Sequence, residues 1–96
     1  MYIYHLKLRA RSPAEAQRVC RFYRHSLHLI SNPGFVNGTY SINHDDPRLI
    51  LIEQQWGSLC ALEAWLTSEV RQRLLQRVAA SIEGPGEIAI YEESCV

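Results

Sequence analysis

Few side chains in this sequence could do chemistry, and the histidines are the first candidates. His25 and His28 stand three residues apart on a predicted helix, so they share a face and could form part of a metal site. A metal site needs further ligands at suitable spacing, and none follows, which favours solvent-facing histidines. His44 adjoins Asp45-Asp46 in a predicted turn and is explained as a turn residue. We therefore expect no bound metal.

Glu53 is the acid with the most unusual position, because it interrupts an apolar strand predicted over residues 49–56. Burial there would raise the carboxyl pKa and make Glu53 a candidate general base. The alternative is an ion pair with an arginine of the first helix or of a partner chain. The sequence favours the ion pair.

The cysteines, at positions 20, 60 and 95, are odd in number and widely spaced. This spacing excludes a complete disulfide framework and a metal-type pair, so we expect reduced thiols. Cys20 and Cys60 fall in apolar helical patterns, where a free cysteine behaves as a small buried residue, and Cys95 falls in a predicted tail.

Length and charge limit the classes of protein to which this sequence can belong. The 96 residues predict one domain over 1–96 with a single core, and 47% hydrophobic content is ordinary for a globular chain. No apolar run approaches the roughly 18 to 20 residues of a membrane span, and the first residues do not follow the order of a signal peptide. Net charge is zero, which gives no general attraction to polyanions. We expect a soluble cytoplasmic protein that binds neither membrane nor nucleic acid.

The elements that must position these side chains follow from hydrophobic periodicity. Strands are predicted over residues 2–8, 35–44, 49–56 and 87–91, and helices over 13–30, 59–66 and 69–82. Ser12-Pro13 supplies a cap for the first helix, and Gly38 marks a bulge or a close approach in the second strand. The order is that of the ferredoxin-like split β-α-β arrangement, an α+β fold with a four-stranded antiparallel sheet and helices on one face.

The third strand carries a nearly continuous apolar run, which predicts that it is central and covered on both faces. Helices on one side would leave the other face of the sheet bare. The residues expected to add apolar surface there, themselves or through their neighbours, are Ile50, Ile52, Trp56, Ile88 and Ile90. Such a surface in a small protein predicts a homodimer whose sheets pack face to face.

Four short segments together resemble the antibiotic biosynthesis monooxygenase (ABM) family of the dimeric α+β barrel superfamily. They are Pro33-Gly34-Phe35, Asp45-Asp46-Pro47, Ile52-Glu53-Gln54-Gln55-Trp56 and Leu62-Glu63-Ala64-Trp65-Leu66. The resemblance covers nearly the whole chain and implies a homodimer that forms a dimeric α+β barrel. In catalytic members it also implies a pocket between each sheet and its helices. Such members include cofactor-independent oxygenases of polycyclic aromatic or quinol-type substrates, and haem-degrading enzymes.

The haem-degrading members resemble one another in an Asn on the first strand, a Trp after the third strand and a His about ten residues further on. Trp65 matches the Trp, but the Asn position falls near His5 or Leu6 and the His position falls at Leu75. Leucine cannot ligate iron, and a lone strand histidine such as His5 is usually structural. The resemblance therefore argues against haem degradation, and it leaves haem or porphyrin binding without degradation as a minor alternative.

Cofactor-free oxygenation needs a base, a polar group that stabilises charge and an apolar pocket that excludes water. Near the expected pocket, the candidate catalytic residues are Trp65 as an aromatic wall, His25 or alternatively His28 as the base, and Asn37 as the hydrogen-bonding group. Substrate contacts are expected from Tyr23, Tyr40, Asn43 and Leu75.

The sequence thus predicts a small monooxygenase without a bound cofactor, acting on a hydrophobic aromatic or quinone-like metabolite. The alternative is a non-catalytic homodimeric module that binds a ligand or a protein, with its aromatic side chains used in packing. Pocket volume separates the two, since a cavity of several hundred cubic ångströms favours the enzyme.

Overall fold

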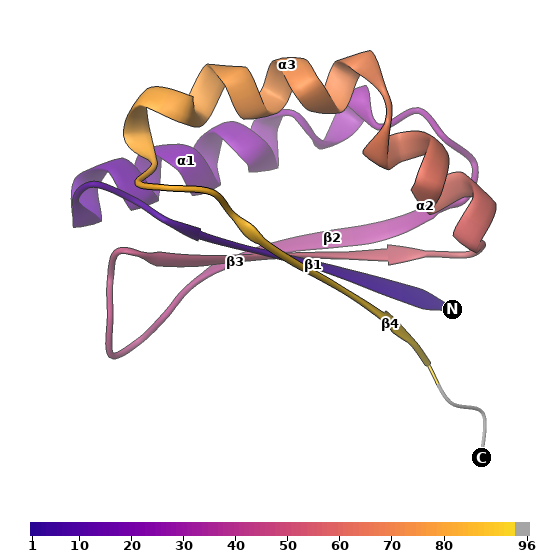
Figure 1. Ribbon diagram of the computed structural model, residues 1–96, viewed down its shortest axis with the longest axis horizontal. Helices are drawn as coiled ribbons and strands as arrows, with labels where there is room; N and C mark the ends of the chain where they lie inside the picture. Colours follow the sequence, from indigo (N-terminus) through magenta and orange to yellow (C-terminus); the bar gives the residue numbers. More distant parts are fainter. Residues whose placement is uncertain (94–96) are drawn as a thin grey trace.

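The computed structural model describes residues 1–93, which form one sheet covered by helices on one face (Figure 1). The strands are β1 (Tyr2–Arg9), β2 (Phe35–Ile42), β3 (Leu49–Trp56) and β4 (Glu87–Glu92). The helices are α1 (Pro13–His25), α2 (Leu59–Leu66) and α3 (Glu69–Val78), with short 3-10 helices η1 (Leu27–Leu29) and η2 (Ala79–Ser81). The sheet is antiparallel in the order β2-β3-β1-β4. The predicted ferredoxin-like α+β arrangement is confirmed.

The core lies between the sheet and the helices, and strand alternation explains its composition. Tyr4, Leu6 and Leu8 of β1 point towards the helices and are buried, because every second residue of a strand faces the same side. The other large contributors from the sheet and the helices are Ile50, Ile52, Trp56, Val19, Tyr23, Leu62, Trp65, Leu74 and Val78. Each fully buried side chain of this size stabilises the fold by about 1.5–3 kcal/mol.

The prediction that β3 is central is confirmed, and the apolar surface on its other face comes from the neighbours of Ile50 and Ile52 rather than from these residues themselves. Leu6 pairs directly with Ile52, so both side chains lie on the helix side of the sheet, and Ile50 and Trp56 follow the same alternation. The side chains that alternate with them, including Leu51 and Glu53, are only partly buried on the open face. Within this chain β3 is therefore covered on one face.

Exposed apolar side chains also occur at the β4 edge of the sheet. Ile88 pairs with Leu6 and Ile90 with Tyr4, which places both isoleucines on the helix side rather than on the open face. They are nevertheless 53% and 42% exposed, because the helix layer does not extend over this edge strand. Tyr91, on the open face, is equally exposed.

The first helix is shorter than predicted. Ser12 accepts a hydrogen bond from the Glu15 N–H, so the predicted cap is confirmed. At the other end, the Ser26 hydroxyl donates a hydrogen bond of 2.8 Å to the Phe22 carbonyl oxygen. This bond gives a partner to a carbonyl in the last turn of the helix. The chain then tightens into η1, which brings Ile30 into the core.

The second strand also ends early, at Ile42 rather than His44. The Asn43 carboxamide oxygen accepts hydrogen bonds from the backbone N–H groups of Asp45 and Asp46, which starts the turn before the strand can continue. The irregularity in pairing lies between Phe35 and Asn37, at Val36, two residues before Gly38.

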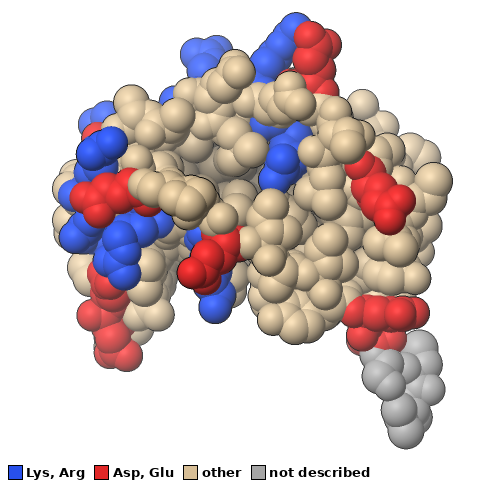
Figure 2. All heavy atoms as spheres, viewed as in Figure 1, with Lys and Arg blue, Asp and Glu red and all other residues tan. Residues whose placement is uncertain are grey.

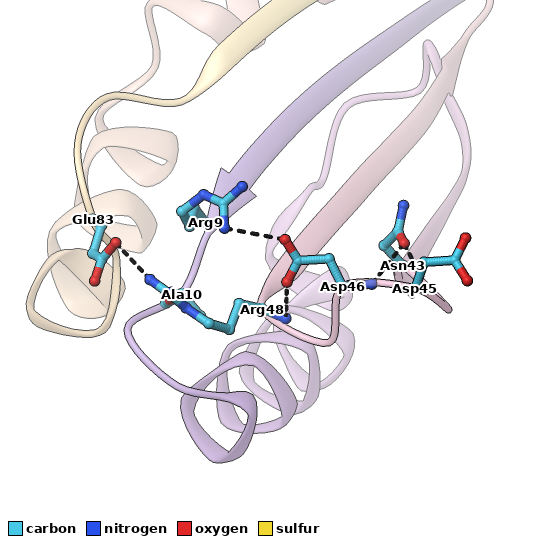
Figure 3. Close-up of polar contacts among 7 residues, drawn as sticks. All are labelled: Arg9, Ala10, Asn43, Asp45, Asp46, Arg48 and Glu83. Atoms are coloured by element: carbon cyan, nitrogen blue, oxygen red, sulfur yellow. Dashed lines mark hydrogen bonds and ion pairs between the residues drawn. The ribbon is translucent and has the colours of Figure 1, made fainter.

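An ion-pair network ties the β2–β3 hairpin to the rest of the fold (Figure 3). Asp46 pairs with Arg9 at 3.1 Å, and its other oxygen accepts the Arg48 backbone N–H. The Arg48 side chain donates to the Ala10 carbonyl and pairs with Glu83 at 2.6 Å. The backbone hydrogen bond from Arg48, followed by the Arg9 side chain, holds the pKa of Asp46 below its ordinary value.

Cys20 is buried as predicted, and burial raises the pKa of its thiol. Cys60 is exposed, so its predicted burial is wrong, and Cys95 lies outside the described residues. Two apolar side chains of the helix layer, Leu59 and Val70, also lie at the surface. Within residues 1–93 no helix is both long enough and apolar enough to cross a membrane.

Candidate functional site

A cluster of polar side chains lies between the sheet and the helices. Arg71 reaches from α3 to Tyr4 on β1, and its Nη2 donates to the Tyr4 hydroxyl at 3.1 Å. Its guanidinium carbon lies 6.0 Å from the centre of the Tyr4 ring, a cation–π distance. On the neighbouring strand, the carboxamide oxygen of the buried Gln54 accepts from Trp56 Nε1 at 3.2 Å. The cluster thus joins one positive charge to several neutral hydrogen-bonding groups.

The turn between α2 and α3 fixes the direction of Arg71. Ser68 caps α3 by accepting the Arg71 backbone N–H, and its hydroxyl donates to the Trp65 carbonyl at 2.7 Å. Arg71 Nη1 also donates a hydrogen bond of 3.4 Å to the Leu66 carbonyl oxygen. Arg71 and Trp65 are therefore held by the same turn.

Tyr23 of α1 contributes the one orphaned group found in the described part of the chain. Its hydroxyl is buried and has no hydrogen-bond partner there. Burial raises the pKa of Tyr23, the nearby Tyr4 raises it further, and Arg71 opposes both effects. Its ring stacks on Tyr40 with 5.8 Å between centroids, and burial raises the pKa of Tyr40 to about 12. A buried hydroxyl without a partner costs about 1–3 kcal/mol, which marks a place where a ligand atom could bind.

The space beside these groups is nearly filled. The cavity that remains has a volume of ≈ 10 Å³, room for one water molecule at most. It is lined by Tyr4, Leu6, Tyr23, Ile52, Gln54, Trp65, Arg71, Leu74 and Leu75. This lining, all of it within residues 1–93, contains neither a carboxylate nor an imidazole. An open pocket of several hundred cubic ångströms is therefore absent from this position.

Two larger hollows lie on the outer side of the same wall. One, of ≈ 290 Å³, is lined by Trp65, Ser68 and the segment 29–33. The other, of ≈ 330 Å³, lies between α1 and α3. Leu29 and Val70 line both hollows, so the two form one groove. Trp65 and Leu74 each line both the groove and the inner cavity, and are the wall between them.

Known structures share this arrangement of strands and helices. No protein-family model and no curated protein sequence matches the chain. The structure is similar to that of a candidate antibiotic biosynthesis monooxygenase from Deinococcus radiodurans, with a TM-score of 0.84 and 20% identity over 100% of this chain and 95% of that one. A second similar structure is a monooxygenase from the gene ActVA-Orf6 of Streptomyces coelicolor, solved with nanaomycin D. Its TM-score is 0.84 and its sequence identity is 17%, over 99% of this chain and 88% of that one. A third is SnoaB, a cofactor-independent oxygenase from Streptomyces nogalater. Its TM-score is 0.77 and its sequence identity is 18%, over 99% of this chain and 94% of that one.

This chain has the antibiotic biosynthesis monooxygenase fold. The resemblance first indicated by four short segments is confirmed at the level of the whole structure, because the match spans all four strands and all three helices. In the ABM fold of this chain, the space between sheet and helices holds the Tyr4, Tyr23, Gln54 and Arg71 cluster.

The ABM fold brings some of the sequence-predicted site residues together. Trp65, Tyr23 and Leu75 line the same inner cavity, and Tyr40 stacks on Tyr23. Leu27 approaches Gly38 closely, since a Cβ there would lie 3.1 Å from the Leu27 Cδ2, so the predicted close approach is confirmed.

Other predicted residues lie far from this cavity in the ABM fold. Asn37 pairs with Gln55 on the open face of the sheet, and Asn43 lies in the hairpin turn. His25, the last residue of α1, and His28, in η1, are both exposed. None of these side chains lines the cavity.

Glu53 has a different partner from the one expected. His5 Nε2 lies 2.7 Å from Glu53 Oε1 on the open face, and the edge of the His5 ring contacts Tyr91 at a centroid distance of 5.2 Å. The prediction of an arginine partner is wrong for this chain taken alone, because β1 and β3 place His5 directly opposite Glu53. Within the described residues no three His, Cys, Asp or Glu side chains are grouped as a metal site.

Sequence reasoning missed Tyr4, Gln54 and Arg71. The sequence did hold a signal for Gln54. Ile50, Ile52 and Gln54 alternate along one face of the strand, and Gln54 is the polar residue on that buried face. Arg71 gave no such signal, because it is one of several arginines on an amphipathic helix.

Proposed function

We propose that this chain is a small cofactor-independent monooxygenase that acts on a hydrophobic aromatic or quinone-like metabolite at the Tyr4, Tyr23, Gln54 and Arg71 cluster. The observation that carries the proposal is the buried, unpartnered Tyr23 hydroxyl beside Arg71. The ABM fold supports it, since similar structures include a monooxygenase solved with nanaomycin D and a cofactor-independent oxygenase.

The cluster suits a substrate that becomes an anion. Arg71 would favour ionisation of a bound phenol, and the hydroxyls of Tyr4 and Tyr23 would donate hydrogen bonds to the phenolate oxygen. An electron-rich phenolate can reduce dioxygen directly. A ring CH2 group then becomes a carbonyl, one oxygen atom enters the product and the other leaves as water with the two hydrogens. In this proposal the positive charge of Arg71 lowers the pKa of the bound phenol, and the proton passes to water rather than to a protein base.

Access requires movement of the wall between the groove and the cavity. Rotation of Trp65 or Leu74 would join the ≈ 10 Å³ cavity to the outer hollows of ≈ 290 and ≈ 330 Å³. The combined space is in the range of small-molecule sites, and the apolar wall would close behind the substrate and exclude water.

We also propose that the chain forms a homodimer through the open face of its sheet. That face presents Ile3, Leu49, Leu51 and Tyr91 without a covering layer in this chain. Light scattering on protein at micromolar concentration should give the mass of a dimer. A monomer under these conditions would remove the proposed interface.

Oxygen consumption tests the enzyme. The purified chain, without added metal or cofactor, should oxidise a panel of anthrones and incorporate one atom of ¹⁸O₂ into each product. Tyr23→Phe should lower turnover at least tenfold, whereas Tyr91→Phe, on the other face of the sheet, should leave it unchanged. No oxygen uptake above the uncatalysed rate with any of these compounds would contradict the proposal.

The nearly filled cavity favours a second candidate, a non-catalytic homodimeric module that binds a ligand or a protein partner. Saturable binding of an aromatic compound with no oxygen uptake would distinguish this module from the enzyme. A saturable Soret shift on titration with haem would assign porphyrin binding to the module, and the absence of a shift would remove that variant.

A further inference from the structure

The groove over the helix layer has an exposed apolar centre. Leu29 from η1 is 44% exposed and Val70 from α3 is 36% exposed, at the place where the two outer hollows meet. Phe22 and Leu74 continue this apolar lining between α1 and α3. Exposed apolar side chains that face one another across a groove lose contact with water when an apolar ligand binds.

Two arginines stand at one end of this groove. Arg73 and Arg77 lie four residues apart on α3, so they share a face of the helix and line the hollow between α1 and α3. Arg73 pairs with Glu69 at 3.2 Å, but both side chains are mostly exposed (71% and 80%), so this pair competes weakly with a ligand. Within the described chain Arg77 makes no ion pair.

The charge of the groove has one sign. Its lining residues include Ser26, Ser31, Asn32 and Ser68 as neutral polar groups, and none of the described lining residues is acidic. Figure 2 shows basic side chains at the top of the view with an acidic side chain beside them, and acidic side chains alone at its right-hand side. An apolar centre with guanidinium groups at one end complements a molecule with an apolar body and one anionic head.

We infer that this groove binds an amphipathic anion. Its apolar body lies over Leu29 and Val70, and its anionic head binds Arg73 and Arg77, whose planar guanidinium groups suit carboxylate and phosphate oxygens. The two hollows, ≈ 290 and ≈ 330 Å³, match the lower end of the range for small-molecule sites, about 300 Å³. This site adjoins the Arg71 cluster across the wall made by Trp65 and Leu74, and its binding of an anion does not depend on the proposed oxygenase activity.

Trp65 provides a reporter for the site, because it lines the groove as well as the inner cavity. Decanoate, decyl phosphate and decanol share one apolar chain and differ in the head group. We expect both anions to bind saturably with a change in tryptophan fluorescence, and decanol to bind at least tenfold more weakly. Stronger binding of either anion identifies the preferred head group.

Variants of the two groove arginines and of the apolar centre test the same site. Arg73→Gln combined with Arg77→Gln should weaken anion binding at least tenfold and leave decanol binding unchanged, whereas Arg18→Gln combined with Arg21→Gln on α1 should have little effect. Val70→Asp should weaken binding of all three compounds. Circular dichroism of each variant confirms that the fold is retained. Equal binding of decanol and decanoate, or anion binding unaffected by loss of both groove arginines, would overturn the inference.

Discussion

Arg71 donates a hydrogen bond of 3.1 Å to the hydroxyl of Tyr4, and this contact joins α3 directly to a central strand of the sheet. The same guanidinium lies at the Leu66 carbonyl, so it also holds the turn between α2 and α3. One side chain therefore couples the position of the helix layer to the position of a tyrosine in the candidate site.

Arg71→Met should lower the free energy of unfolding by about 1–2 kcal/mol, because the Tyr4 hydroxyl and the Leu66 carbonyl lose a charged donor. Arg73→Met, on an exposed turn of the same helix, should change it by less than about 0.5 kcal/mol. Urea denaturation followed by fluorescence measures both. Equal effects of the two substitutions would show that the Arg71 contact adds nothing to stability.

Tyr23→Phe should leave stability unchanged or raise it by about 1 kcal/mol, because it removes a buried hydroxyl that has no partner. Tyr4→Phe should act in the opposite direction, since the Tyr4 hydroxyl accepts from Arg71. Thermal unfolding of the two variants side by side gives the sign of each change. A large loss of stability in Tyr23→Phe would mean that its hydroxyl is bonded in solution.

Gly34→Ala should destabilise the fold by about 1–3 kcal/mol through overpacking, because a Cβ on Gly34 would lie 2.4 Å from the Cβ of Ala61. The backbone is fixed on both sides of this contact, since the Gly34 N–H donates to Asn32 and its carbonyl accepts from Gly57. Adding Ala61→Gly should restore part of the loss. A double variant no more stable than Gly34→Ala alone would place the strain elsewhere.

Alkaline pH should destabilise the fold partly through Tyr40. Its pKa is raised to about 12 by burial, whereas an unfolded tyrosine ionises near pH 10. Between these values the unfolded chain releases the proton first, so stability falls as pH rises from about 10 to 12. Tyr40→Phe should make the decline shallower in denaturant titrations at fixed pH, and Tyr91→Phe should not.

Acid should release the hairpin network. The pKa of Asp46 is lowered from 3.8, so its contribution is complete above that value and is lost as pH falls below it. Asp46→Asn should therefore flatten the dependence of stability on pH below about 4. An acid unfolding curve identical to that of the parent chain would show that the pair with Arg9 carries no net stabilisation.

The arrangement of elements could be predicted because local signals agree with it. The alternation of Tyr4, Leu6 and Leu8 defines the inner face of β1, and Ser12-Pro13 defines the start of α1. The faces of β3 could not be predicted from its apolar run, because residues 49–52 are apolar at every position and show no alternation. Sheet pairing supplies that information by placing Ile52 beside Leu6.

The candidate site was less predictable than the fold. Aromatic residues such as Tyr23 and Trp65 could be placed near the core from helical spacing. His25 was assigned to the same site, but the helix ends at this residue and leaves it exposed. The contact between Arg71 and Tyr4 depends on how the α2–α3 turn directs one long side chain across the core, which no local pattern encodes.

The order of strands in the sheet also determines when its centre can form. Leu6 of β1 pairs with Ile52 on one side and with Ile88 on the other, so both partners of β1 follow it in the chain, the second much later than the first. Until then both edges of β1 lack their partners, and closing these long loops slows folding. During synthesis one edge of β1 therefore stays unpaired until β3 follows it and the other until β4 follows it, and its apolar side chains are open to chaperones in that interval.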